Sequence, residues 1–131
     1  MNILSREQIL QAKDLVTEVV EVPEWSGSVL VKSLTGAERD QYEAAIVEQK
    51  GRDTKVNMRN ARARLVALSV VDEEGKRLFS PNDVSLLGTK SAAALQRVFN
   101  VSMRLSGISA EDVRELTEEL EENPFEDSPS D

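Results

Sequence analysis

The chain has 131 residues, the usual size of one domain, and carries 24 acidic against 16 basic side chains, a net charge of −8. It contains no cysteine and no histidine, which excludes disulfides, thiolate nucleophiles, imidazole catalysis and almost every transition-metal site. Glycine-rich phosphate loops and calcium-binding loops are also missing from the sequence. We therefore expect a non-enzymatic binding or scaffolding protein with no cofactor.

Helix starts are the clearest local signal. In each, a hydroxyl side chain and a residue three positions later can cap each other's backbone amides. The pairs are Ser5 with Gln8, Thr35 with Glu38, Ser80 with Asp83, and Ser109 with Asp112. Together with apolar periodicity they predict helices over about 6–13, 36–49, 57–70, 81–87, 90–106 and 110–121.

Two runs rich in β-branched residues, at 17–23 and 28–34, flank a turn that contains Gly27. This pattern predicts a β-hairpin over about 17–34. An isolated two-stranded hairpin is unstable, so helices or a partner must cover it. Trp25 lies at the predicted tip, where it either folds back over the hairpin or anchors a partner protein.

The middle of the chain is predicted to form a loop at 50–56 and a brief pairing of 76–79 with 70–71. Six basic residues fall between positions 50 and 64: Lys50, Arg52, Lys55, Arg59, Arg62 and Arg64. No aromatic residue is interleaved with them, and the net charge of the chain is negative, which disfavours nucleic-acid binding. We interpret the run as a solvated face or as a dock for the acidic end of the chain.

Acidic residues gather at the C-terminal end. Residues 108–131 hold ten acids and one base, a net charge of −9; since the whole chain carries −8, residues 1–107 carry +1. Val113, Leu116 and Leu120 recur at helical spacing. Three interpretations remain open for this region: a packed helix with a charged outer face, a partner-binding arm, or a nucleic-acid mimic. Residues 122–131 are predicted to be a disordered tail.

The sequence thus predicts one mostly α-helical α+β domain over residues 1–121. Its N-terminal β-hairpin, about 17–34, packs on a bundle of about five helices within 35–121, and a disordered acidic tail follows at 122–131. The first residues lack the basic and apolar regions of a signal peptide. No apolar run reaches the ~20 residues of a membrane span, so no membrane partner is expected.

Three stretches of the sequence are familiar in combination. They are LSREQIL at 4–10 with VEVPEWSG at 20–27 and LTGAERD at 34–40, then ARARLVALSVVDEEGKRLF at 61–79, and finally residues 92–107, which end in RLSG. Taken together, they resemble the tail assembly chaperones of long-tailed bacteriophages and prophages. None of these stretches is a catalytic motif.

The resemblance implies a protein that binds the tape-measure protein and keeps it soluble while tail-tube subunits polymerise around it. It also implies work in the host cytoplasm, absence from the mature virion, and a longer frameshifted form that recruits the tail-tube protein. Self-association is compatible with the isolated hairpin and the apolar stripes of the helices. The residues predicted at a protein-binding surface are Trp25, Val113, Leu116 and Leu120. Two alternatives stay open: a tail-completion or connector subunit of the virion, and an acidic inhibitor that mimics DNA.

Overall fold

The computed structural model describes residues 2–50, 53–56 and 60–108. Its centre is a three-stranded antiparallel sheet in the order β1-β2-β5. Strands β1 (Thr17–Val22) and β2 (Gly27–Lys32) pair in register from Thr17 opposite Lys32 to Val22 opposite Gly27. The predicted hairpin is therefore confirmed. Its turn is the 3₁₀ helix η1 (Pro23–Trp25), followed by Ser26 in the left-handed region at φ 57°.

The third strand was predicted only as a partner of residues 76–79, and its place in the sheet was not predicted. Strand β5 (Val70–Val71) adds to the free edge of β2, with Leu30 opposite Val71 and Val31 opposite Val70. This pairing joins segments far apart in the sequence, so only the tertiary structure reveals it. The predicted pairing beyond this strand is present, because Leu78 donates its backbone N–H to the Val70 carbonyl at 3.2 Å.

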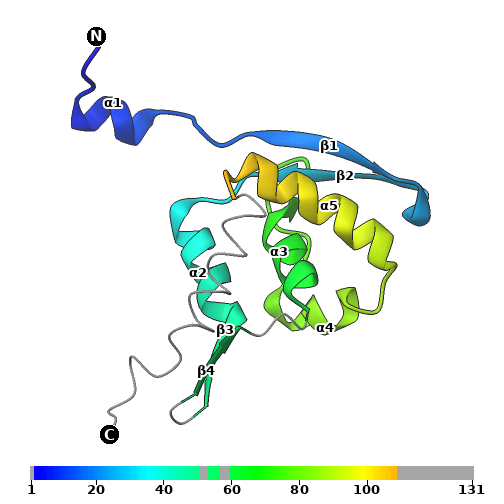
Figure 1. Cartoon of the computed structure of the whole chain (residues 1–131). Coiled ribbons are helices and arrows are strands. Elements are labelled where there is room, and N and C mark those ends of the chain that lie inside the picture. Colours follow the sequence, from blue (N-terminus) through cyan, green and yellow to red (C-terminus); the bar gives the residue numbers. More distant parts are fainter. Residues whose placement is uncertain (1, 51–52, 57–59, 109–131) are drawn as a thin grey trace, which may run out of the picture.

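Helix α5 (Ala92–Leu105) covers one face of the sheet and contacts both strands of the hairpin (Figure 1). Val20, Val22 and Val31 are buried beneath it. The helical spacing of Leu95, Val98, Phe99, Ser102 and Leu105 predicts one apolar face. All of these residues except the half-buried Leu105 are buried, and Ala94 and Met103 widen the face. Gly107, at φ 71°, follows the helix, as glycine commonly does at a helix end.

Helix α3 (Ala61–Ser69) is the most deeply buried helix of the described residues and packs on α5. Met58, Ala61, Leu65 and Leu68 recur at helical spacing, which predicts one apolar stripe. Ala61, Leu65 and Leu68 are buried, but so are residues on the other sides of the helix. Ser69 satisfies its buried hydroxyl by donating to the Leu65 carbonyl at 2.8 Å. The helix begins at 61, because Asn60 adopts the left-handed conformation at φ 60°. Met58, the first member of the predicted stripe, lies outside the described residues.

The region predicted as a loop contains a second hairpin, so that prediction was wrong. Helix α2 (Gly36–Ile46) ends three residues earlier than predicted, and β3 (Val47–Lys50) pairs antiparallel with β4 (Asp53–Val56). Figure 1 shows this hairpin projecting from the end of α2. Its strands are only four residues long and mostly polar, so they lack the apolar alternation that identifies a strand in a sequence.

The remaining helices are short. Helix α1 comprises Arg6–Gln11, and the segment predicted as a helix at 81–87 divides into the 3₁₀ helix η2 (Pro81–Asp83) and α4 (Val84–Leu87). Three of the predicted capping boxes are formed, at Ser5, Thr35 and Ser80. The fourth, at Ser109, lies outside the described residues, as do the helix predicted at 110–121 and the tail predicted at 122–131.

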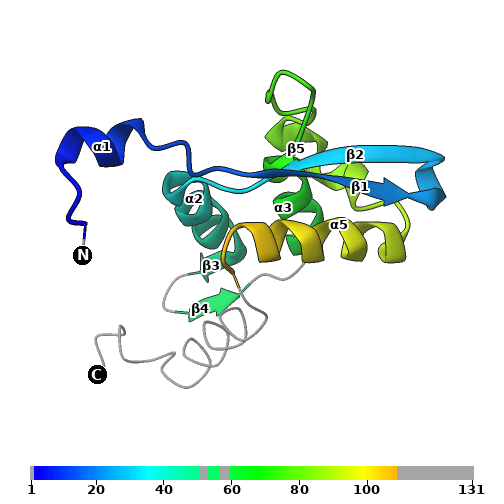
Figure 2. The same cartoon turned by 90° about the horizontal axis from the view of Figure 1, so that it is seen from above.

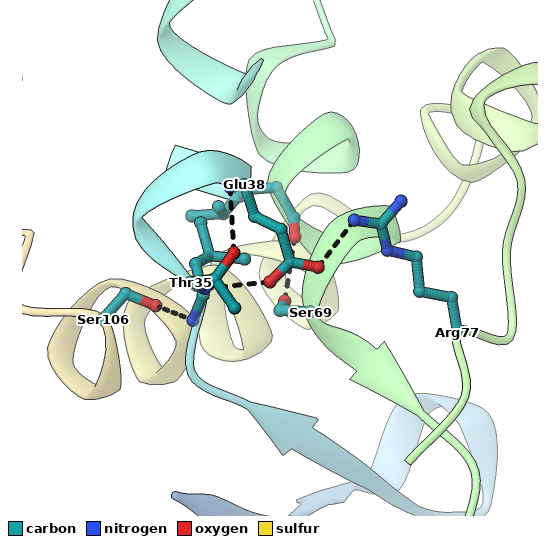
Figure 3. A network of polar contacts seen from close by, with 7 residues as sticks. Thr35, Glu38, Ser69, Arg77 and Ser106 are labelled. Atoms are coloured by element: carbon teal, nitrogen blue, oxygen red, sulfur yellow. Dashed lines mark hydrogen bonds and ion pairs between the residues drawn. The ribbon is translucent and has the colours of Figure 1, made fainter. Parts of the chain in front are cut away.

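A polar network ties the start of α2 to two distant segments (Figure 3). The Glu38 carboxylate accepts from the Thr35 backbone amide at 2.9 Å and from the Arg77 guanidinium at 2.6 Å. Ser106 accepts from the Leu34 amide at 2.9 Å and so attaches the end of α5 to the same corner. Burial of Glu38 opposes its ionisation, but the bonds from Thr35 and Arg77 outweigh it and hold the pKa of this carboxyl below 4.5.

We predict that Glu38→Gln lowers the free energy of unfolding by about 0.5 kcal/mol at neutral pH, because the amide keeps the cap but loses the half-exposed ion pair. The Glu38 carboxyl has a lower pKa in the folded protein than in the unfolded chain, where its pKa is 4.5. Its ionised form therefore stabilises the fold at pH values above 4.5, and this stabilisation is lost as the pH falls through the folded-state pKa. The difference in free energy of unfolding between wild type and Glu38→Gln should therefore disappear at low pH. Urea unfolding at several pH values measures it.

The matched control is Glu43→Gln, which removes the same charge from an exposed pair with Arg39 on the same helix. It should leave stability almost unchanged at neutral pH. A gap for Glu38→Gln that stayed constant down to low pH would contradict the role of the ionised carboxylate.

Candidate protein-binding surface

The N-terminal arm, residues 2–16, extends away from the body of the molecule in both views (Figures 1 and 2). Its helix α1 has a complete capping box. The backbone N–H of Gln8 donates to Ser5 Oγ at 3.2 Å, and the side-chain Oε1 of Gln8 accepts from the backbone N–H of Ser5 at 2.8 Å. No residue of α1 is buried. The cap therefore holds the helix locally, without help from the core.

Large apolar side chains stay exposed along this arm. They are Ile3, Leu4, Ile9, Leu10, Leu15 and Val16, and Val19 continues the series at the start of the hairpin. Leu4 and Ile9 are an apolar pair five residues apart across the helix cap, a spacing that favours mutual packing, yet they remain 53% and 57% exposed. Single exposed apolar residues are normal on a protein surface, but a continuous set on one projecting segment marks an interaction site.

The base of the arm is fixed although its helix is not covered. The Val16 amide donates to Ser33 Oγ at 3.0 Å, and the Ser33 amide donates to the Val16 carbonyl at 2.8 Å. The charged residues of the arm balance, with Arg6 and Lys13 against Glu7 and Asp14. The arm therefore offers apolar contact area without a net charge, and its attachment point is set by the end of the sheet.

Trp25 is half-buried at the hairpin tip and packs against the hydrophobic core. The neighbouring Glu24 carboxylate accepts from the Arg97 guanidinium of α5 at 2.5 and 3.1 Å. The Arg97 bond holds the pKa of Glu24 below its usual value. At the opposite end of the hairpin, Glu18 accepts from Arg104 at 2.7 Å. The tip is thus folded back on α5, and part of Trp25 remains accessible for the predicted anchoring role.

A second apolar surface lies on the other side of the core. We call it the Phe79 groove: two adjacent hollows that share Phe79. One hollow is lined from α2, α3 and the segment around Pro81, and the other from the same segment and α4. Their apolar lining consists of Ala45, Ala67, Leu68, Leu78, Phe79, Pro81, Val84, Leu86 and Leu87. Leu78 and Leu86 are 53% and 66% exposed at the second hollow.

Two arginines of the basic run have defined surroundings. Arg62 lies 5.9 Å from the centre of the Phe99 ring and donates to Gln96, whereas Arg64 lines the Phe79 groove. Close by, burial raises the pKa of Tyr42 to about 12, with the two arginines opposing the rise. Arg62 remains exposed, in agreement with a solvated face, whereas Arg64 is partly buried. The side chains of Lys50, Arg52, Lys55 and Arg59 lie outside the described part of the chain.

Of the residues predicted at a protein-binding surface, the structure places only Trp25. Val113, Leu116 and Leu120 lie outside the described residues. The arm and the Phe79 groove were missed by sequence reasoning. The arm had one available signal: the helix predicted at about 6–13 has only Ile9, Leu10 and Ala12 as apolar residues, too few for a core-facing stripe. The groove had none, because it is assembled from elements far apart in sequence.

Among residues 2–50, 53–56 and 60–108, no three potential ligands of the His, Cys, Asp and Glu types come together around a metal-sized site. Within the same residues, no helix has the length and apolar character required to cross a bilayer.

A family model described as phage tail assembly chaperone matches residues 6–119, most of the chain. The chain belongs to this family. The match confirms the resemblance inferred from the sequence. No curated protein sequence matches the chain.

A solved structure shares the fold of this tail assembly chaperone. It is the tail assembly chaperone of bacteriophage HK97, which superimposes with a TM-score of 0.54 at 18% sequence identity. The superposition covers 76% of this chain and 94% of the HK97 protein. At this identity the similarity establishes the common fold alone.

We predict that Trp25→Ala lowers the free energy of unfolding by about 2 kcal/mol, less than a fully buried Trp would cost, because the residue is half-buried. Urea unfolding followed by circular dichroism measures the change, since the variant lacks the only tryptophan. Val19→Ala, on a side chain 66% exposed in the same hairpin, is the control and should be nearly neutral. Equal stability of wild type and Trp25→Ala would contradict the packing of the tip.

Proposed function

We propose that this tail assembly chaperone binds the tape-measure protein through its N-terminal arm and keeps that protein soluble during tail assembly. Family membership supports the chaperone role. The observation that carries the proposed surface is the arm itself: a capped helix with no buried residue, flanked by exposed apolar side chains.

The chemistry of such a client fits the arm. The tape-measure protein implied by the family resemblance presents long amphipathic helices, which would aggregate through their apolar faces if left uncovered. Apolar burial is non-directional, so one arm accepts many similar helical faces. The arm carries no net charge, so this binding depends on apolar contact area and stays reversible.

The family resemblance also implies how the protein acts, where it acts and which other proteins it contacts, and we include these roles in the proposal. The protein acts by binding and without catalysis, in the host cytoplasm, and leaves before the virion is complete. A longer frameshifted form contacts the tail-tube protein, and copies of the chain associate with one another. Mass spectrometry of purified particles tests the departure: stoichiometric amounts in the virion would instead favour a structural tail-completion or connector subunit.

We predict that Leu10→Glu weakens binding to the tape-measure protein by about 2 kcal/mol, roughly 30-fold in Kd, because a buried leucine contributes about that much. Isothermal titration of the purified proteins measures the affinity. Raising the salt concentration should change wild-type binding only modestly, since the arm is neutral and screening acts on charges.

The matched control is Leu86→Glu. Leu86 is also a helical leucine and is also 66% exposed, but it lies at the Phe79 groove. This variant should keep wild-type affinity for the tape-measure protein. If Leu10→Glu bound normally while Leu86→Glu failed, the client would occupy the groove and the arm would be the wrong surface. Binding that collapsed in salt would favour the acidic mimic.

A further inference from the structure

The Phe79 groove combines an apolar floor with a positive rim. Its two hollows are lined by three cationic side chains, Arg64, Arg77 and Lys90, against the single carboxylate of Asp83. Leu78 and Leu86 remain largely exposed beside them. An occupant that fits both features must alternate apolar side chains with carboxylates.

The charges of the groove are not equally available. Arg77 donates to Glu38 at 2.6 Å, and Asp83 accepts from the Ser80 amide at 2.9 Å. Arg64 differs, because its Nε is buried and has no hydrogen-bond partner in the described part of the chain. A buried donor without an acceptor is unfavourable. Arg64 also lines this hollow, so a carboxylate placed there meets a positive charge that the described residues leave without an ion pair.

Two segments of this chain carry unpartnered apolar residues, and their charges differ. The N-terminal arm has no net charge, so it does not complement the positive charge at the rim of the groove. The segment beyond Ile108 holds ten acids and one base, with Val113, Leu116, Leu120 and Phe125 spaced among them. This composition matches both the floor and the rim of the groove.

We propose that the chain's own acidic C-terminal segment, residues 113–125, docks over the Phe79 groove of the same molecule. Its apolar side chains cover Leu78, Phe79 and Leu86, and its carboxylates pair with Arg64 and Lys90. This inference concerns a surface separate from the arm and goes beyond the proposed function.

The distances allow the contact. The segment leaves the body next to Ser106, which is bonded to Leu34 just before α2. From there α2 runs about 14 Å to Ala45 in the wall of the groove, at 1.5 Å per residue. The chain from Ile108 to Leu120 spans up to ~40 Å when extended. The leucines therefore reach the groove with length to spare.

The test uses the full-length chain, whose lack of cysteine allows a nitroxide to be attached at Ser128→Cys alone. In the ¹⁵N-labelled protein, the nitroxide should abolish the amide signals of Leu78 and Leu86 and leave that of Leu10 intact. Introducing Leu86→Glu should restore the Leu78 signal, because a negative charge in the groove repels the acidic segment and releases the nitroxide from the groove. Leu10→Glu, the same substitution at equal exposure on the arm, should restore nothing.

Two results would overturn the proposal. One is a full-strength Leu78 signal in the labelled wild-type background. The other is signal loss that appears only when spin-labelled and ¹⁵N-labelled molecules are mixed, which would show docking on a second copy. Since Leu86 is exposed, its substitution leaves the fold intact, and the amide spectrum of the variant verifies this.

Discussion

The seating of α5 on the β1–β2 hairpin is the contact on which the rest of the structure depends. A two-stranded hairpin has too little core of its own to persist in water. Val20, Val22 and Val31 become buried only because α5 lies across them with Leu95 and Val98. Ion pairs from Arg97 and Arg104 hold both ends of the hairpin on the helix. The same helix packs on α3, so sheet and helices share one core.

This arrangement leaves the arm with nothing to cover it. The inner face of the hairpin is occupied by α5, and the edge of β2 is taken by β5. Helix α1 therefore remains beyond the end of the sheet with its leucine and isoleucine side chains in water. A capping box stabilises such a helix by about 1 kcal/mol, which favours the helical conformation without burying any side chain. A segment of this kind can bind and release an apolar client without disturbing the core.

The sequence predicted the local features well and the long-range ones poorly. The capping boxes at Ser5, Thr35 and Ser80 follow from neighbouring side chains, so they were correct. The buried face of α5 followed from its 3.6-residue periodicity. The pairing of β5 with β2 was missed because it joins distant segments, and the β3–β4 hairpin was missed because its strands are short and polar. Trp25 was correctly placed at the tip, but only the fold shows it packed on the core.

By itself, the sequence determined the helix starts, the hairpin, the separation of a neutral body from an acidic end, and a family resemblance. The helix starts and the hairpin depend on residues within a few positions of one another, where capping and periodicity act directly. The charge separation depends only on composition, and the resemblance depends on three stretches taken together. The tertiary structure alone decided which apolar side chains remain uncovered. Leu10 and Leu95 are both helical leucines, yet one is 66% exposed and the other 6%. The physical reason is that burial depends on what other elements cover a residue, and the sequence of one helix does not contain that information.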